Sequence, residues 1–242
     1  MPIQRLVVVG DAHLGAVSER VESALLRFLD AVPQLGDGLL VNGDLFGFWF
    51  SYRRAIPREG IQVVTRLAAL ARNFPVMLTG GNHDRWGAEF WERELGIQFA
   101  PGELELRLGT GTVLALHGDG LAEPNRRAAF KNWLVRNPLI TAGYRLLPAD
   151  LGFWVTSHLG GGNPTPASRR WEAKAAALQR SWAERRLRDA APGTLLIMGH
   201  THVAAAETPS PGRRYLNPGA WLDGQRYAVA TDSTLDLKQY PG

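Results

Sequence analysis

The sequence predicts an α/β fold whose two halves differ in pattern. In the first half, short apolar runs typical of buried strands alternate with amphipathic helical segments, which favours parallel strands covered by helices. In the second half, Pro and Gly turns separate short apolar runs, and we expect these strands to pair mostly antiparallel. Residues 122–190, between the halves, are helical in pattern and rich in Arg, Ala and Trp. We therefore expect a core of residues 1–121 and 191–242, and we call residues 122–190 the insertion.

Local signals support each expected element. Residues 5–9 and 39–42 are apolar except for Arg5 and Asn42 at their ends, as is typical of strands buried on both faces. Apolar side chains recur with helical spacing after Ser18, a residue type that caps helices, and Pro57 suits the first position of a second helix. A third strand is expected over 75–79 and a third helix near 88–95. The second half predicts a hairpin of 104–108 with 113–116, and strands over 195–198, 204–207, 214–216 and 226–231.

The composition excludes several classes of protein. The chain has 242 residues, 45% of them hydrophobic, so it can bury a large core and is not disordered throughout. It contains no Cys, which excludes disulfides, thiolate nucleophiles and Cys-ligated zinc. The sequence shows neither a signal-peptide pattern nor an apolar run of about 18 residues, and we expect a cytoplasmic protein.

Positive charge is concentrated in the insertion. Residues 122–190 carry 12 Lys or Arg and 5 Asp or Glu, whereas the rest of the chain carries 15 and 18. Such segregation indicates either a region that binds an anion or an ordinary solvated helical surface.

Five polar motifs follow the expected strands, and they contain five of the six His of the chain. Polar groups at the carboxyl ends of strands are where α/β proteins place their sites. The motifs are Asp11-Ala-His13, Gly43-Asp44, Gly81-Asn82-His83-Asp84, His117-Gly118-Asp119 and Gly199-His200-Thr201-His202.

The residue types in these motifs favour metal binding. Carboxylate, imidazole and carboxamide groups suit Mn²⁺, Fe²⁺ or Zn²⁺ better than a soft ion such as Cu⁺. Seven such groups are too many for one ion with open positions, so two ions that share a carboxylate fit better. A single motif could be structural, for example an Asx turn at Asn82, but the full set in this order favours a site. We expect two divalent ions, Mn²⁺ first, with Fe²⁺ or Zn²⁺ as alternatives.

In their order and spacing, these motifs resemble the calcineurin-like metallophosphoesterase family, over residues 1–120 and 191–242. The resemblance implies a four-layer α/β/β/α sandwich of two mixed sheets with two metal ions at the strand ends. It also implies in-line attack on phosphorus by a hydroxide that bridges the two ions. Catalytic His83 would protonate the leaving oxygen or stabilise the charge, and Asp84 would orient its ring. It assigns one ion to Asp11, His13, Asp44 and His202, and the other to Asp44, Asn82, His117 and His200.

A narrower resemblance is to the UDP-2,3-diacylglucosamine hydrolases of lipid A synthesis, which cleave a pyrophosphate. It rests on Gly43-Asp44-Leu45-Phe46, Trp49, the His-Gly-Asp motif at 117–119, Gly219-Ala220-Trp221 and the position of the insertion. Two positions differ, because His83 stands where that subfamily has Arg and Gly47 where it usually has Glu. The phosphoesterase chemistry is unaffected, and the substrate is left open.

The insertion suggests how a substrate would be held. Its four Trp and its apolar segments lie among Arg residues, which suits either a groove for an anionic amphiphile or a small helical core with surface Arg. Phe46, Phe48, Trp49 and Phe50 are expected at the same opening. We predict substrate contacts from Trp49, Asn125, Arg126, Arg127, Arg169 and Arg170. His158 is expected on the surface or in a loop of the insertion, which could also touch the inner face of a membrane.

Three functional hypotheses follow. The first is a hydrolase of a small anionic phosphoester, lipid-linked or a nucleotide diphosphate, with no obligate protein partner. The second is a nuclease or cyclic-nucleotide phosphodiesterase, although the Arg residues form no single long basic stripe and a nucleic acid is not the expected partner. The third is a non-catalytic scaffold, against which the ligands at every motif argue.

Overall fold

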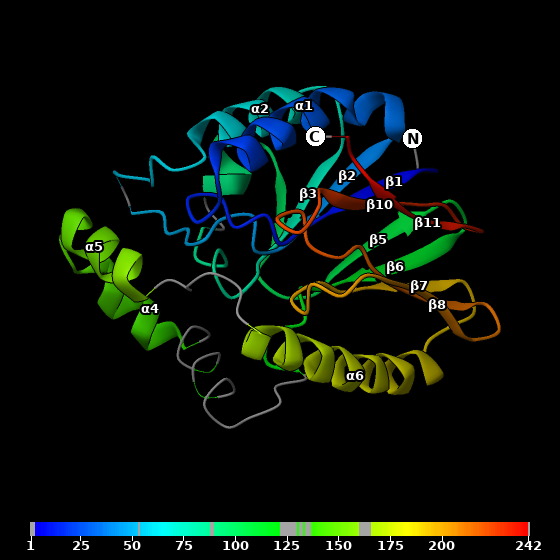
Figure 1. The fold of residues 1–242 in the computed structure, drawn as a ribbon. Coiled ribbons are helices and arrows are strands. Elements are labelled where there is room, and N and C mark those ends of the chain that lie inside the picture. Colours follow the sequence, from blue (N-terminus) through cyan, green and yellow to red (C-terminus); the bar gives the residue numbers. More distant parts are fainter. Residues whose placement is uncertain are drawn as a thin grey trace.

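The structure is a computed structural model that describes residues 3–52, 54–87, 90–121, 130, 133, 137–159 and 166–241. Two β-sheets face each other. Helices α1 (Glu19–Leu35) and α2 (Ile61–Ala71) cover the outer face of one sheet, and α6 (Pro166–Arg188) covers the other (Figure 1). This arrangement confirms the expected α/β/β/α sandwich.

The first sheet has six strands in the order β11-β10-β1-β2-β3-β4. Strands β1 to β4 are parallel, and β10 and β11 extend the sheet in antiparallel pairs. Their bounds are Leu6–Val9 (β1), Gly38–Asn42 (β2), Val76–Thr79 (β3), Gln98–Ala100 (β4), Arg226–Ala230 (β10) and Leu235–Gln239 (β11).

The second sheet has five strands in the order β5-β6-β7-β9-β8. Their bounds are Leu104–Leu108 (β5), Gly111–Ala115 (β6), Thr194–Ile197 (β7), Ala205–Ser210 (β8) and Arg213–Asn217 (β9). The expected hairpin of β5 and β6 is confirmed, and the second half pairs mostly antiparallel as expected, although β6, β7 and β9 run parallel to one another. The long connection through the insertion and α6 returns the chain to the starting edge before β7, as a parallel pair requires.

Successive side chains of the central strands point to opposite faces of the sheet and so belong to two layers of core. Leu6 and Val8 of β1 pack between the sheets with Leu40, Leu195 and Leu216, where all five are buried. Their neighbours on the other face of the first sheet pack against α1 and α2. This period of two explains why the central strands show continuous apolar runs in the sequence.

Two expected helices differ in the structure. The second begins at Ile61 rather than at Pro57, because Gly60 in front of it has a left-handed backbone that ends the preceding loop. The third is a single π-helical turn, Phe90–Glu94. Strands β4 and β11 were not predicted, because β4 has three residues and most side chains of β11 are exposed.

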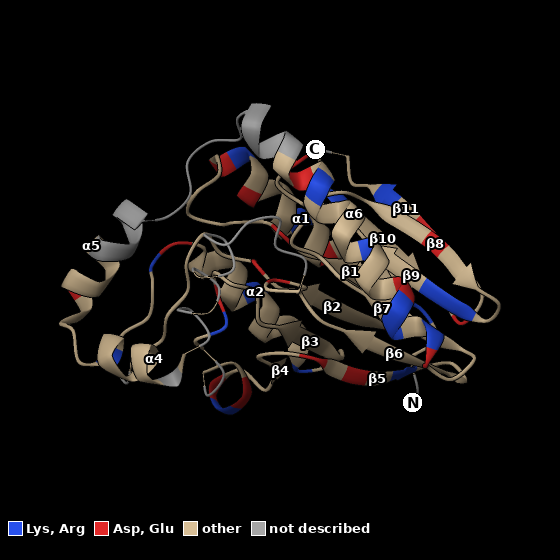
Figure 2. Ribbon diagram, turned by 90° about the horizontal axis from the view of Figure 1, so that it is seen from below, with Lys and Arg blue, Asp and Glu red and all other residues tan. Residues whose placement is uncertain are grey.

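The insertion contributes to two parts of the molecule. Helices α4 (Pro138–Arg145) and α5 (Ala149–Leu159) project beyond one end of the sandwich (Figure 1). Helix α6 instead packs on the second sheet, where Ala183 and Leu187 are buried against Leu196 and Met198, and Figure 2 shows Lys and Arg along its surface. The domain division at residue 191 stays a prediction, but α6 belongs to the outer layer of the sandwich.

Candidate metal centre

The seven candidate ligands lie in the loops that follow five strands. Asp11 and His13 follow β1, Asp44 follows β2 and Asn82 follows β3, all in the first sheet. His117 follows β6 and both His of the 199–202 motif follow β7, in the second sheet. Backbone bonds join neighbouring loops, since the Asp11 and His13 amides donate to the carbonyls of Gly43 and Asp44 at 3.0 Å each.

The backbone of this region is unusual at the ligands themselves. Among the described residues, six other than Gly have a positive φ, and five of the six are candidate ligands. These five are Asp11 (52°), His13 (49°), Asp44 (49°), His200 (69°) and His202 (59°). Left-handed conformations of this kind cost energy and concentrate at functional sites. No pattern in the sequence indicates this strain.

The ligand side chains gather around two carboxylates. Asp44 Oδ2 lies 3.1 Å from His117 Nε2 and 3.9 Å from His13 Nε2, while Asp11 Oδ1 lies 3.4 Å from His202 Nε2. Potential donor atoms within 4.8 Å of one another form three groups, which are Asp11–His13–His202, His13–Asp44–His83 and Asp44–His117–His200. The first and third groups fall within the two ligand sets that the sequence resemblance implied, and Asp44 lies beside both.

Four buried polar atoms in this cluster lack a hydrogen-bond partner. They are Asp11 Oδ1, His13 Nε2, Asn82 Oδ1 and His117 Nε2. Buried polar atoms in proteins nearly always have a hydrogen-bond partner. A divalent cation would supply the missing partner here, because oxygen and imidazole nitrogen atoms are ligands that such ions bind. The donor set therefore fits the divalent metals that this chemistry needs.

The carboxylates and imidazoles of the cluster shift one another's pKa values. Burial opposes the charged form of His117, but the carboxylates of Asp44 and Asp11 outweigh it and raise the pKa of His117 well above its usual value. Burial likewise opposes ionisation of Asp44, but His117 and His83 hold the pKa of Asp44 well below its usual value. His13 behaves differently, because burial dominates and lowers its pKa to about 4. His117 and Asp44 therefore each favour the charged form of the other.

Of the two predicted catalytic residues, His83 lies at the cluster, and Asp84 makes other contacts than expected. His83 Nδ1 lies 2.6 Å from the carbonyl of Gly47, which leaves Nε2 facing the cluster 4.0 Å from Asp44 Oδ2. Asp84 is fully buried and accepts from the backbone amides of Leu45 (2.7 Å) and Gly81 (2.8 Å). The expectation that Asp84 orients the His83 ring was therefore wrong. The Gly47 carbonyl holds the ring, and Asp84 ties the loops after β2 and β3 together.

Close packing at glycine explains why the motifs contain Gly. A Cβ at Gly81 would overlap the Asp44 carboxylate, and one at Gly43, where φ is 78°, would lie 2.5 Å from His117 Nδ1. Glycine lets the backbone approach these ligands without a collision.

Trp221 and Gln179 form hydrogen bonds that hold the loops of the site in place. Trp221, in the Gly-Ala-Trp motif near the end of the chain, is fully buried, and its amide donates to the Gly10 carbonyl at 3.0 Å. The side chain of Gln179, on α6, donates to the Gly199 carbonyl at 3.0 Å and accepts from Tyr215 at 2.9 Å. The sequence did not single out Gln179, and its helical position carries no signal of this role.

The aromatic residues after Asp44 form a core rather than an opening. Trp49, a predicted substrate contact, is fully buried and packs against Phe46 and Trp91, with ring centroids 4.4 Å and 5.2 Å away. In this structure it has no exposed surface to offer a substrate. Phe46 and Phe50 are also buried, and only Phe48 of the four keeps partial exposure.

The other predicted substrate contacts remain predictions. Asn125, Arg126 and Arg127 lie outside the described residues, as do the side chains of Arg169 and Arg170 in the first turns of α6. The backbone of His158 lies in α5, and its side chain is also outside the described part.

Aromatic side chains of the insertion pack against the loops of the site, in contacts that the sequence does not indicate. Tyr144 of α4 packs against Phe50 and Trp86, with centroids 4.6 Å and 5.4 Å away, and Phe153 of α5 packs against Tyr52 at 5.6 Å. Trp86 lies three residues after His83, so α4 rests on the loop that carries the predicted catalytic residue.

An ion pair that was also missed joins the loops of the two sheets. The Arg85 guanidinium donates to both carboxylate oxygens of Asp119 at 2.8 Å and 2.9 Å, and to the carbonyl of Pro101. Arg85 lies two residues after His83, and Asp119 two residues after His117. Pairs this far apart in the sequence cannot be found without the fold.

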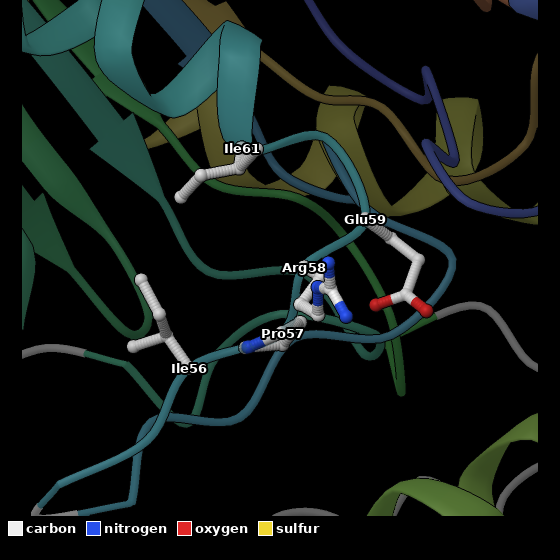
Figure 3. Close-up of a pocket in the computed structure, with 5 residues that line it drawn as sticks. All are labelled: Ile56, Pro57, Arg58, Glu59 and Ile61. Carbon is white, nitrogen blue, oxygen red and sulfur yellow. The ribbon is translucent and has the colours of Figure 1, made fainter.

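An open hollow of about 550 Å³ lies in the loop before α2 (Figure 3). It is lined by Ile56, Pro57, Arg58, Glu59 and Ile61. None of these five is a candidate metal ligand.

Comparisons with known proteins identify the family of the chain. The family model for calcineurin-like phosphoesterases matches residues 4–204. The UDP-2,3-diacylglucosamine hydrolase of Shewanella sp. strain MR-4 is 26% identical over 251 aligned residues, which cover 98% of each chain. The enzyme of the same name from Porphyromonas gingivalis is 25% identical over 257 aligned residues, which cover 97% of each chain. Among solved structures, the E. coli phosphoesterase Yfce aligns over 98% of this chain and all of its own, at 16% identity and a TM-score of 0.48.

The chain belongs to the calcineurin-like phosphoesterase family, and it is a metal-dependent phosphoester hydrolase. Within the part of the chain that the structure describes, no helix is long and apolar enough to cross a membrane.

Proposed function

We propose that this protein is a dinuclear phosphoesterase that hydrolyses a phosphodiester or pyrophosphate bond in an anionic amphiphile, such as a UDP-diacylglucosamine-like molecule. The observation that carries the proposal is the position of Asp44, whose Oδ2 lies 3.9 Å from His13 Nε2 and 3.1 Å from His117 Nε2. A carboxylate placed in this way can be shared by two ions, the arrangement that phosphoryl transfer commonly uses.

Two divalent ions, with Mn²⁺ preferred over Fe²⁺ and Zn²⁺, would supply a nucleophile at neutral pH and neutralise charge on the phosphoryl oxygens. Asp11, His13, Asp44 and His202 would hold one ion, and Asp44, Asn82, His117 and His200 the other. The unpaired atoms of four of these residues support this assignment.

His83 and Asp84 have separate tasks in this proposal. Because the Gly47 carbonyl accepts from His83 Nδ1, the Nε2–H of a protonated His83 can donate to the leaving oxygen. Asp84 fixes the spacing of the loops that carry Asp44 and Asn82 through its two backbone bonds.

The insertion supports an amphiphilic substrate. Several large apolar side chains of its described part are exposed, and they lie on or near α4 and α5. They are Phe130, Trp133, Leu139, Ile140, Leu146, Leu151 and Trp154. The contact of Tyr144 with Trp86 brings these helices next to the loop of His83. The curated relatives, whose name specifies a diacylated UDP-sugar, align over the insertion as well as the core.

An exposed apolar surface of this kind also suits peripheral contact with a membrane that contains the substrate. In our proposal the protein acts at the cytoplasmic face of the inner membrane. Its basic residues along α6 would favour an anionic surface.

Kinetics on a series of diphosphate substrates of increasing acyl length test the proposal. Each buried CH₂ contributes about 0.8 kcal/mol, so kcat/KM should rise about 4-fold per CH₂ until the apolar surface is filled. The variant Leu139→Asn/Leu146→Asn should flatten this dependence, because both side chains are largely exposed on the insertion. The control Leu237→Asn, on β11, should keep it.

A kcat/KM that does not change with acyl length would contradict the amphiphile substrate. Single-stranded DNA and cyclic nucleotides would then be the substrates to test. Binding of DNA that weakens steeply as salt rises would support the nuclease alternative.

A further inference from the structure

The first part of α6 lies against the loop that carries the last two candidate ligands. The Trp171 ring stands edge-on to His200, with centroids 5.6 Å apart and planes at 84°. Glu172 faces His202, and Gln179 bonds the Gly199 carbonyl. Gln179 also accepts from the Thr201 hydroxyl at 3.4 Å, so one helix contacts all four residues of the 199–202 motif through side chains.

His202 lies between two carboxylates. Its Nε2 is 3.4 Å from Asp11 Oδ1, and its Nδ1 is 3.9 Å from Glu172 Oε1. Nδ1 and Nε2 are distinct positions of the imidazole ring, so one nitrogen faces the metal cluster while the other faces α6. The side chains of His202 and Glu172 are each 23% exposed, which leaves room for the short approach that a hydrogen bond requires.

We propose that Glu172 is a positioning residue for His202. The Glu172 carboxylate accepts the Nδ1–H of the ring, which fixes the tautomer whose Nε2 lone pair faces Asp11 and is free to bind metal. A ligating His usually donates its second N–H to a carboxylate or carbonyl, and such partners orient the ring and make it more basic. The proposal rests on the proposed metal centre, because it requires His202 to be a ligand.

Glu172 is not placed to be a ligand itself. It contacts the nitrogen of His202 that does not face Asp11, and it belongs to none of the three groups of potential donor atoms. Its partial exposure also distinguishes it from Gln179, which is fully buried and bonded to four other residues around the loop. Loss of the Glu172 carboxylate should therefore affect the metal site more than the stability of the fold.

Mn²⁺ binding to the full-length protein tests this role, with affinities measured by competition against a chromogenic chelator. Glu172→Ala should weaken one of the two ions by about 10–100-fold. Glu172→Gln should lose less, because its amide oxygen can still accept from Nδ1–H. The matched control Glu184→Gln, at an exposed position on the same helix, should bind as the wild type. The melting temperature of the metal-free protein should be the same in all four proteins.

A double variant separates the proposed role from a general effect. If Glu172 acts through His202, Glu172→Ala should cost nothing further in a His202→Ala background. Wild-type affinity in Glu172→Ala, or an equal loss in both backgrounds, would overturn the inference and leave the proposed function intact. A wild-type protein that binds no Mn²⁺ would overturn the metal centre, and this inference with it.

Discussion

His117 Nε2 and Asp44 Oδ2 lie 3.1 Å apart, and the two residues come from different sheets. Asp44 follows β2 of the first sheet, and His117 follows β6 of the second. Their contact joins the two halves of the sandwich at the end where the other ligands gather. The pair also explains why neither group has its usual pKa, since each stabilises the charged form of the other.

This pair predicts that metal binding releases protons. Although burial opposes it, the carboxylates of Asp44 and Asp11 raise the pKa of His117 well above its usual value, so the metal-free protein keeps that proton at pH 7. A metal ligand must be neutral imidazole, so Mn²⁺ has to displace the proton, and its affinity should fall as the pH falls. Calorimetric titration at pH 7 in two buffers of different ionisation enthalpy should show release of about one proton or more. Binding heats that do not depend on the buffer would contradict the prediction.

Substitution of the shared carboxylate should affect both ions. Asp44→Ala should leave the protein with almost no bound Mn²⁺ after dialysis, whereas His202→Ala should weaken mainly the ion that Asp11 also contacts. Metal analysis and the metal-free melting temperature would be measured together. Loss of a single ion in Asp44→Ala, in a protein that remains folded, would mean that Asp44 is not shared.

His83→Ala should slow turnover without removing metal. We expect kcat to fall by about 10²–10⁴-fold, as for the loss of a general acid, with metal content nearly unchanged. The effect should be smaller for a substrate whose leaving group is already a weak base, such as p-nitrophenolate.

Two results would count against this role of His83. An equal loss of kcat for good and poor leaving groups would leave only an electrostatic contribution. Loss of metal would show that His83 is a ligand, as its place in the His13–Asp44–His83 group allows. Asn82→Ala is the comparison, since it removes a predicted ligand next to His83 and should deplete metal.

A matched pair of glycine substitutions tests the crowding around Asp44. Gly81→Ala should displace the Asp44 carboxylate, because the added Cβ would overlap it, and should weaken Mn²⁺ binding strongly. Gly102→Ala adds the same group where the structure has no atom within 4 Å, and should leave metal affinity unchanged. Equal behaviour of the two variants in a metal titration would rule out the crowding.

The apolar runs predicted the strands well where these are buried on both faces, whereas the sandwich was implied by the family resemblance. The runs of β1 and β2 are continuous and apolar because one face packs between the sheets and the other packs under helices. The order of β7, β8 and β9 was harder, because local patterns do not say whether a strand pairs with its neighbour in sequence. The role of α6 as an outer layer was missed for the same reason, since Ala183 and Leu187 give a weak apolar stripe on a helix rich in Arg.

The motifs predicted which residues gather at the site but not what surrounds them. Residues that directly follow a strand in the sequence, such as Asp11 and His13 after β1, could be found from their position in the motif. Contacts between distant segments could not, and these include Arg85 with Asp119 and Glu172 with His202. Trp49 was placed at the opening because it follows Asp44 closely, whereas its large apolar ring packs into the core between Phe46 and Trp91.

The central claim is that Asp44 is shared between two metal ions. A crystal structure of the protein grown with Mn²⁺, with anomalous diffraction measured near the manganese edge, tests it most directly. The account predicts two anomalous peaks about 3.5–4 Å apart, with the Asp44 carboxylate between them. Asp11 and His202 should lie beside one peak, and His117 and His200 beside the other. A single peak at full Mn²⁺ saturation, with Asp44 bound to that ion alone, would contradict the account.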